Sequence, residues 1–298
     1  MLRRLLSLVD DYLVLWVALA VAVGVTTPRL AAVTAYSTPI LAAMVGSVSL
    51  TLSVADFREV PTRSLRPALV GHAAMPLVAF AVARLLGLSP ALTAGFVVLG
   101  GVTPELVTPV MTELADGDTA LASAVLVLAG VGSVALLPIA AALFVGGVAV
   151  DSARIVEELL VAVVAPMLLA VAVRTRFPAA VGRYDDDYPA VAALLVVVVI
   201  GGVAAANADL LRSAALPVVA AGALTLNVAG YGIGWTLGRD LPAPRRVATT
   251  LSVGMRDFAV AAALVVAAGF PAAAALPAVA FGVVELATSA ALARYWSD

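Results

Sequence analysis

Long apolar runs alternate with short polar turns along the whole chain. Eight of the ten runs have about 17 to 25 residues, or slightly more, which a tilted helix needs to cross about 30 Å of hydrocarbon. The runs are Tyr12–Thr27, Thr38–Val54, Pro67–Leu86, Leu92–Gly101 with Glu105–Ala115, Thr119–Val150, Ile155–Val173, Pro189–Asn207, Ala214–Leu237, Val247–Gly254 with Asp257–Ala268, and Ala272–Tyr295. The pattern predicts an all-α, polytopic membrane protein with ten transmembrane helices.

Composition supports this class. Of the 298 residues, 63% are hydrophobic and 12% are charged, whereas soluble domains hold about 45–50% apolar residues. The chain has no cysteine, which excludes disulfides and thiolate chemistry. Arg3 and Arg4 precede the first run without a small-residue cleavage site, so we expect a retained first helix and not a removed signal.

The arginines predict the orientation. All 17 basic residues are arginine, and a cytoplasmic N-terminus places twelve at cytoplasmic ends, four at outer ends and Arg256 inside the membrane. Such a bias favours a cell-membrane protein with both termini in the cytoplasm. The cytoplasmic set is Arg3, Arg4, Arg58, Arg63, Arg66, Arg174, Arg176, Arg183, Arg239, Arg245, Arg246 and Arg294; the outer set is Arg29, Arg84, Arg154 and Arg212.

The fourth and ninth runs are interrupted at corresponding places, by Val102-Thr103-Pro104 and by Val253-Gly254-Met255. They divide the chain into two five-span halves, residues 1–150 and 151–298. An odd number of spans makes the halves inverted repeats. Interrupted helices in inverted halves point to a midplane binding site, because exposed helix ends offer backbone groups to a ligand.

Ionisable residues within the runs are the candidate site. Arg256 and Asp257 follow the ninth-run interruption, and charges at this depth usually face a pathway or cavity. The alternative is an ion pair with a purely structural role. Glu285, in the tenth run, could partner Arg256 or extend toward the membrane surface.

The fourth run adds further polar candidates. Its prolines could merely kink a helix, but that leaves Glu105 unexplained, and we expect its polar groups to face the interior. Asn227 could join helices or line the site, whereas His72 is interpreted as a helix-packing residue. The substrate- or ion-binding candidates are Thr103, Glu105, Thr108, Pro109, Thr112, Asn227, Ser252, Met255, Arg256, Asp257 and Glu285.

Several stretches resemble the bile acid:sodium symporter family of ten-helix secondary carriers. They are MVGSVSLTLSVADF at Met44–Phe57, MPLVAFAVARLLGLSPALTAGFVVLGG at Met75–Gly101, VMTELADGDTALASAV at Val110–Val125 and VGMRDFAVAAALVVA at Val253–Ala267. The resemblance implies a panel domain of spans 1, 2, 6 and 7 and a core domain of spans 3–5 and 8–10. It also implies that broken helices four and nine cross in the core and that solute moves as the domains move.

This chain departs from the family at the positions that bind sodium in relatives. Thr108-Pro109 stands where many relatives have Ser-Asn, and Ala122 and Leu126 replace small hydroxyl residues. The ninth-helix pattern Glu-x-Gly-x-Gln-Asn reads Ser252 through Asp257 here, and Gly71 stands at a glutamine position. The resemblance therefore does not carry over the two sodium sites.

These features predict a secondary transporter of a small organic solute. We expect this solute to be an anion held by Arg256, because a guanidinium can bind a carboxylate bidentately. Buried carboxyl groups could carry protons, so we expect the coupling ion to be a proton or a differently bound sodium. We expect no cofactor, no metal site and no nucleic-acid partner. An enzyme is not expected, because one histidine and no nucleophile motif remain. A non-transporting receptor or structural membrane protein is the alternative.

Overall fold

The computed structural model describes residues 13–58, 60–148, 151–185, 187–212 and 215–297, and these residues form helices without any strand. Eight helical segments in them are long and apolar enough to cross a membrane, and Leu15–Thr26 and Pro90–Gly101 are shorter apolar helices. The predicted class, an all-helical polytopic membrane protein, is confirmed, while the count of ten spans stays a prediction. Arg3 and Arg4, and Tyr12, which begins the first predicted span, lie outside the described residues.

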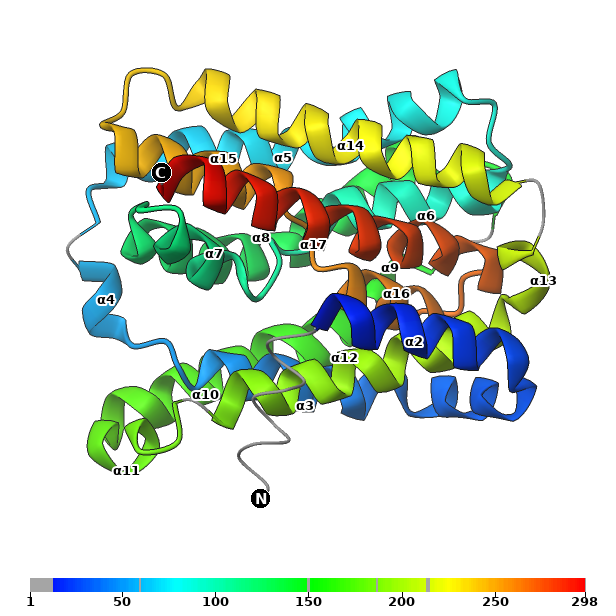
Figure 1. Ribbon diagram of the computed structural model, residues 1–298, viewed down its shortest axis with the longest axis horizontal. Coiled ribbons are helices and arrows are strands. Elements are labelled where there is room, and N and C mark those ends of the chain that lie inside the picture. Colours follow the sequence, from blue (N-terminus) through cyan, green and yellow to red (C-terminus); the bar gives the residue numbers. More distant parts are fainter. Residues whose placement is uncertain (1–12, 59, 149–150, 186, 213–214, 298) are drawn as a thin grey trace.

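One layer of helices lies at the bottom of Figure 1. Its central helix α12 packs against α2, η1 and α3, and α3 also contacts η2 and α10. The bounds are α2 (Leu13–Thr26), the 3-10 helix η1 (Pro28–Tyr36), α3 (Ser37–Ser49), the π-helix η2 (Leu159–Val164), α10 (Ala165–Arg176) and α12 (Asp187–Ala206).

A second layer lies at the top of Figure 1, where α14 packs against α5, α15 and α17, and α5 packs against α6 and α8. Its bounds are α5 (Thr62–Leu85), α6 (Pro90–Gly101), α7 (Thr108–Leu114), α8 (Thr119–Phe144), α14 (Ala215–Leu237), α15 (Ala243–Gly254) and α17 (Leu276–Ser297). Helix α16 (Phe258–Ala267) joins the layers, because it contacts α3 and α12 on one side and α6 and α17 on the other.

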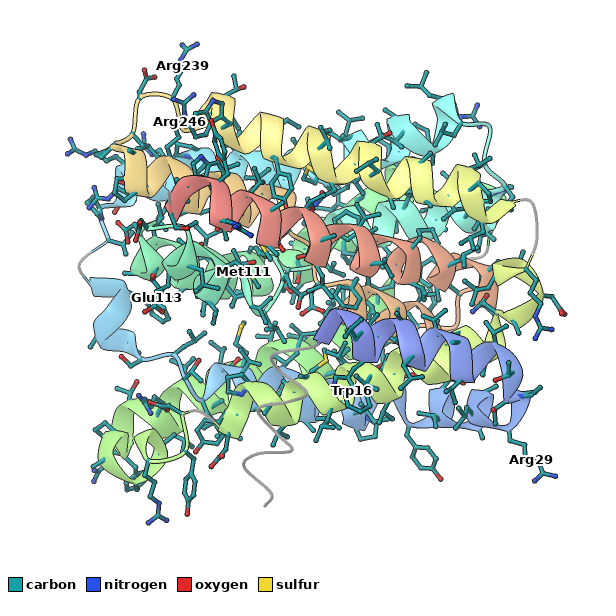
Figure 2. The ribbon with its side chains drawn as sticks, in the orientation of Figure 1. Trp16, Arg29, Met111, Glu113, Arg239 and Arg246 are labelled. Atoms are coloured by element: carbon teal, nitrogen blue, oxygen red, sulfur yellow. The ribbon has the colours of Figure 1, made fainter. Side chains whose placement is uncertain are left out.

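Short helices connect these elements. They are α4 (Val54–Arg58), α9 (Ser152–Glu158), α11 (Pro178–Gly182), α13 (Ala208–Leu211) and η3 (Ala272–Ala275). Figure 2 shows Arg239 and Arg246 at one end of the long axis and Arg29 at the other. The first two arginines belong to the predicted cytoplasmic set and Arg29 to the outer set.

Polar caps set several helix starts. The Asp118 carboxylate accepts a hydrogen bond from Leu121 N at 2.9 Å and starts α8, and Asp151 does the same for α9 through Ala153 N and Arg154 N. These bonds satisfy amide groups that a helix start leaves unpaired. The cap begins α9 at Ser152, three residues before the predicted Ile155. Helix α8 ends at Phe144 and not at Val150, ahead of Gly147, whose φ is 75°.

Two local helices were not predicted from the sequence. The 3-10 helix η1 begins at Pro28, whose ring fixes φ in the helical range, so the segment before the predicted Thr38 start is already helical. The π-helix η2 is followed by Pro166, in the first turn of α10. Proline lacks an N–H donor and clashes with the preceding turn, which favours such a widening.

The chain leaves the helical conformation in the fourth and ninth predicted runs. Helix α6 ends at Gly101 and α7 begins at Thr108, so the predicted start at Glu105 is wrong. Pro104 disfavours helical geometry at the residue before it. Between α15 and α16, Met255 has an extended backbone with ψ of 134°. The two interruptions touch, because Asp257 N donates to Thr103 O at 3.1 Å.

Candidate functional site

A guanidinium lies where the interruptions meet. Arg256 is fully buried, with a relative exposure of 0%. Its Nη2 donates to Val253 O at 2.8 Å, and its Nη1 donates to Val102 O at 3.4 Å and to His72 Nδ1. Because arginine can only donate, His72 must accept through Nδ1 and carry its proton on Nε2.

The carbonyl partners of Arg256 belong to two helix ends. Val102 caps the C-terminus of α6, and Val253 lies in the last turn of α15. A helix C-terminus carries about half a negative charge, which a cation stabilises. Arg256 therefore neutralises two converging helix C-termini at once.

No acid in the described part of the chain pairs directly with this cation. Arg256 makes no ion pair with any carboxylate of the described residues. Asp257, its neighbour, accepts a hydrogen bond from Val260 N at 2.7 Å through Oδ1 and so caps α16. The predicted compensation of Arg256 by Asp257 or Glu285 is thus not a contact in the part of the chain that the structure describes.

Three buried carboxyl groups surround the crossing. Glu105 follows the first interruption and Asp257 the second, and Glu285 is fully buried with no hydrogen-bond partner for either oxygen among the described residues. Glu105 Oε1 accepts from Leu106 N at 3.1 Å, while its Oε2 is buried without a partner in the described chain. One guanidinium can balance only one of these three carboxylates.

Asn227 ties α14 to the interruption and to α17. Its Nδ2 donates to Gly254 O at 3.2 Å, and its Oδ1 accepts from Thr288 Oγ1 at 2.7 Å. Thr288 Oγ1 lies 3.4 Å from the Tyr231 hydroxyl. Asn227 therefore satisfies the open end of α15 from a neighbouring helix.

The remaining candidates are enclosed around the same region. Thr112 Oγ1 donates to Thr108 O at 2.7 Å, and Met255 belongs to a buried apolar cluster with Tyr231 and Leu251. The side-chain hydroxyls of Thr103, Thr108 and Ser252 are buried without a hydrogen-bond partner in the part of the chain that the structure describes.

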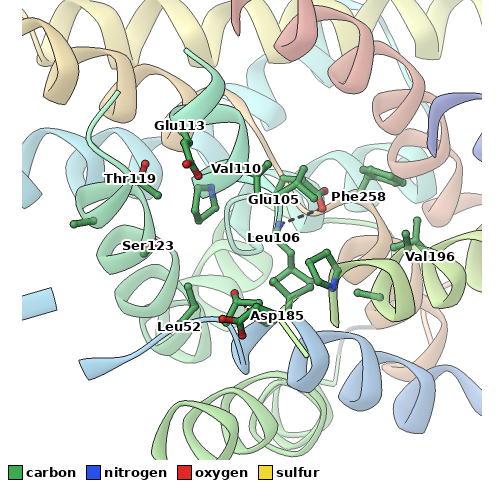
Figure 3. A pocket seen from close by; sticks show the side chains of 18 of the residues that line it. Leu52, Glu105, Leu106, Val110, Glu113, Thr119, Ser123, Asp185, Val196 and Phe258 are labelled. Atoms are coloured by element: carbon green, nitrogen blue, oxygen red, sulfur yellow. Dashed lines mark hydrogen bonds between the residues drawn. The ribbon is translucent and has the colours of Figure 1, made fainter. Parts of the chain in front are cut away.

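A cavity of about 740 Å³ opens between the two layers beside Glu105 (Figure 3). Its lining includes Glu105 and Pro109 of the candidates. The other walls come from α3, α7, α8 and α12, through residues such as Val48, Glu113, Ser123 and Val196, with Phe258 at the start of α16. This volume suits a small organic solute, since ligand cavities span about 300–1,000 Å³.

The structure thus divides the candidates between two places. Glu105 and Pro109 line the cavity, whereas Arg256, Asp257, Glu285, Asn227, Ser252 and Met255 are not among its lining residues. Sequence reasoning assigned His72 to packing and missed its bond to Arg256. The only signal was its position one turn before Met75-Pro76, as the one ionisable residue of Gly71–Ala83 in a membrane run.

A multi-pass helical membrane protein with a solute-sized cavity between two helix layers has the architecture of a membrane carrier. The chain belongs to the sodium bile acid symporter family, whose sequence profile matches residues 38–214, more than half of the chain. It is also 27% identical over 290 residues to YocS of Bacillus subtilis (strain 168), an uncharacterized sodium-dependent transporter; the match covers 95% of this chain and 90% of the relative. The predicted family and the predicted role in transport are confirmed.

Proposed function

We propose that the protein is a secondary active transporter that moves a small organic solute by alternating access, without sodium at the helix crossing. The observation that carries this proposal is the position of Arg256, whose guanidinium bonds to carbonyls at both helix C-termini. The cavity between the layers supplies the solute site.

The inferred architecture follows from the same arrangement. The lower layer corresponds to the panel domain and the upper layer, with α16, to the core domain, within two inverted repeats of residues 1–150 and 151–298. Helices α6 with α7, and α15 with α16, act as broken helices four and nine of ten. Both termini lie in the cytoplasm, in agreement with arginines gathered at one end.

Sodium coupling is the competing candidate, because the name of YocS describes it as sodium-dependent. Two unit charges 4 Å apart repel by about 4 kcal/mol at an effective dielectric near 20. The guanidinium also uses carbonyl oxygens of the kind that hard cations require as ligands. A second cation beside Arg256 is therefore disfavoured twice, by repulsion and by competition for oxygens.

Protons are the coupling ion that the buried acids favour. Glu105, Asp257 and Glu285 are all buried, and Arg256 is the only buried guanidinium among the described residues. Uncompensated charges in an apolar interior are costly, so two of the three groups must be protonated or matched by a bound cation. Proton exchange with water through the cavity would reach Glu105 first.

The expected anionic substrate receives no support from Arg256. That side chain is fully buried and does not line the cavity, and its Nη atoms already bond to the protein. The proposed function therefore does not include an anion clamp.

Uptake into proteoliposomes tests the proposal, with a panel of labelled organic solutes and with sodium and proton gradients imposed separately. We expect a proton gradient to drive accumulation and a sodium gradient at fixed pH to have little effect. The Glu105→Gln variant should lose the response to protons. Glu157→Gln is the control, because Glu157 is an exposed carboxylate of α9 that does not line the cavity. Saturable, sodium-driven accumulation would refute the coupling proposal.

A further inference from the structure

All the charged side chains that line the cavity are acidic in the part of the chain that the structure describes. None of the described residues that line the cavity is basic, whereas Glu105, Glu113 and Asp185 are acidic. Asp185 is neutralised, since Arg174 Nη1 and Nη2 donate to its two oxygens at 2.6 and 2.8 Å. Glu113 makes no ion pair with any described residue. Two carboxyl groups are thus left without a cationic partner.

Glu105 is positioned to meet a ligand. Its side chain is only 5% exposed, and the accessible space beside it is the cavity. Oε1 is held by Leu106 N, which fixes the carboxylate, and Oε2 is buried with no partner among the residues described. A buried acceptor that the protein leaves unsatisfied is a ready partner for a donor on a solute.

The remaining walls suit an apolar body. Leu52, Leu106 and Val196 surround the space in Figure 3, and Phe258 closes it on the α16 side. Thr119 and Ser123 add hydroxyl groups on the α8 side. An aromatic ring near a carboxylate also favours ammonium groups through cation–π attraction.

From these features we propose that the cavity takes a small organic cation, a protonated amine on an apolar body, with Glu105 as its counter-ion. This inference rests on the proposed function and names its substrate class. A negative field between low-dielectric walls concentrates cations and repels anions. Glu105 then binds either a proton or the solute, which makes the transport cycle an exchange of the two.

The absence of cysteine allows a direct test on the full chain. Val110 lines the cavity and is 48% exposed, so Val110→Cys offers one thiol to reagents in the cavity. The purified variant is treated with a trimethylammonium-ethyl or a sulfonatoethyl methanethiosulfonate, which form a mixed disulfide and release methanesulfinate. The ratio of the two rates is compared with the same ratio for free cysteine.

We expect the ratio of the cationic to the anionic labelling rate to be about tenfold higher for Val110→Cys than for free cysteine. The negative field of the cavity attracts the cationic reagent and repels the anionic one. Glu105→Gln and Glu113→Gln, each combined with Val110→Cys, should reduce the preference. Thr119→Cys, at the start of α8 in the same lining, should show the same preference. In addition, 2-phenylethylamine should slow the labelling of Val110→Cys more than the matched carboxylate 3-phenylpropionate, and the difference should shrink in Glu105→Gln.

A ratio at or below that of free cysteine, or stronger protection by 3-phenylpropionate than by the amine, would overturn the proposal. The labelling needs no gradient and no transport, so its failure leaves the proton-coupled carrier intact. Conversely, sodium-driven uptake would refute the coupling proposal without altering the labelling ratio.

Discussion

The guanidinium of Arg256 acts here as a fixed internal cation and not as half of an ion pair. Its partners are Val102 O, Val253 O and His72 Nδ1, and no described carboxylate pairs with it. Arginine suits this role because its planar fork can donate to several acceptors at once, whereas an ammonium is a point charge.

Replacing Arg256 by Gln should therefore destabilise the protein strongly. A glutamine amide is too short to serve both helix ends, and a buried carbonyl left unpaired costs about 1–3 kcal/mol. The thermal unfolding midpoint in detergent measures the effect. Arg239→Gln is the control, because Arg239 and its Asp240 partner are exposed and should contribute little.

The double variant Arg256→Gln with Asp257→Asn separates two explanations. If Asp257 balanced the guanidinium, removing both charges would restore stability. The structure instead has Asp257 capping α16, and asparagine caps equally well. We expect no rescue, and a double variant as stable as the parent would contradict the role assigned to Arg256.

Sequence reasoning located the ionisable residues of the membrane runs but not their partners. Glu105, Arg256 and Glu285 stand out because charges are rare in such runs. The bonds from Arg256 to the carbonyls and to His72 form only because two helix ends that are distant in the sequence meet in space. No local sequence pattern indicates that meeting. Glu105 lines the cavity and Arg256 does not, and this difference depends on the same tertiary arrangement.

At the scale of elements, the helix interruptions require close backbone contact. A Cβ added to Gly230 of α14 would lie 2.8 Å from Gly254 Cα and 2.9 Å from Val253 O. Both are backbone atoms, which cannot rotate away. Small residues permit this approach between membrane helices.

Gly230→Ala should therefore separate α14 from the end of α15 and destabilise the protein by about 1–3 kcal/mol. Gly232→Ala, two residues along the same helix, is the matched control, since its Cβ would meet nothing within 4 Å. Alanine there should be neutral or stabilising, because it is the better helix former. Equal thermal midpoints for the two variants would contradict the close contact.

The element boundaries show which local signals can be read from a sequence. Helix α12 and helix α14 lie close to their predicted ranges, since length and hydropathy define them. The π-helix at Leu159–Val164 and the non-helical Glu105–Val107 were not predicted, because apolar composition does not distinguish helix types. Prolines near both segments were the only local indication.

At the scale of the whole molecule, the described residues form two helix layers with a cavity between them, joined at α16. Sequence analysis could not locate the cavity, because lipid-facing and protein-facing positions are both apolar in a membrane protein. The family resemblance supplied only the expectation of a panel domain and a core domain. We propose that a fixed guanidinium, and not bound sodium, holds the helix crossing while the layers move.

The sodium dependence of thermal stability tests this claim most directly. Unfolding of the purified protein is followed in sodium chloride and in potassium chloride at equal ionic strength and pH, without solute. A ligand at one hundred times its Kd would stabilise the folded state by about 2.7 kcal/mol. We predict identical unfolding midpoints in the two salts, and a saturable increase seen with sodium alone would contradict the account.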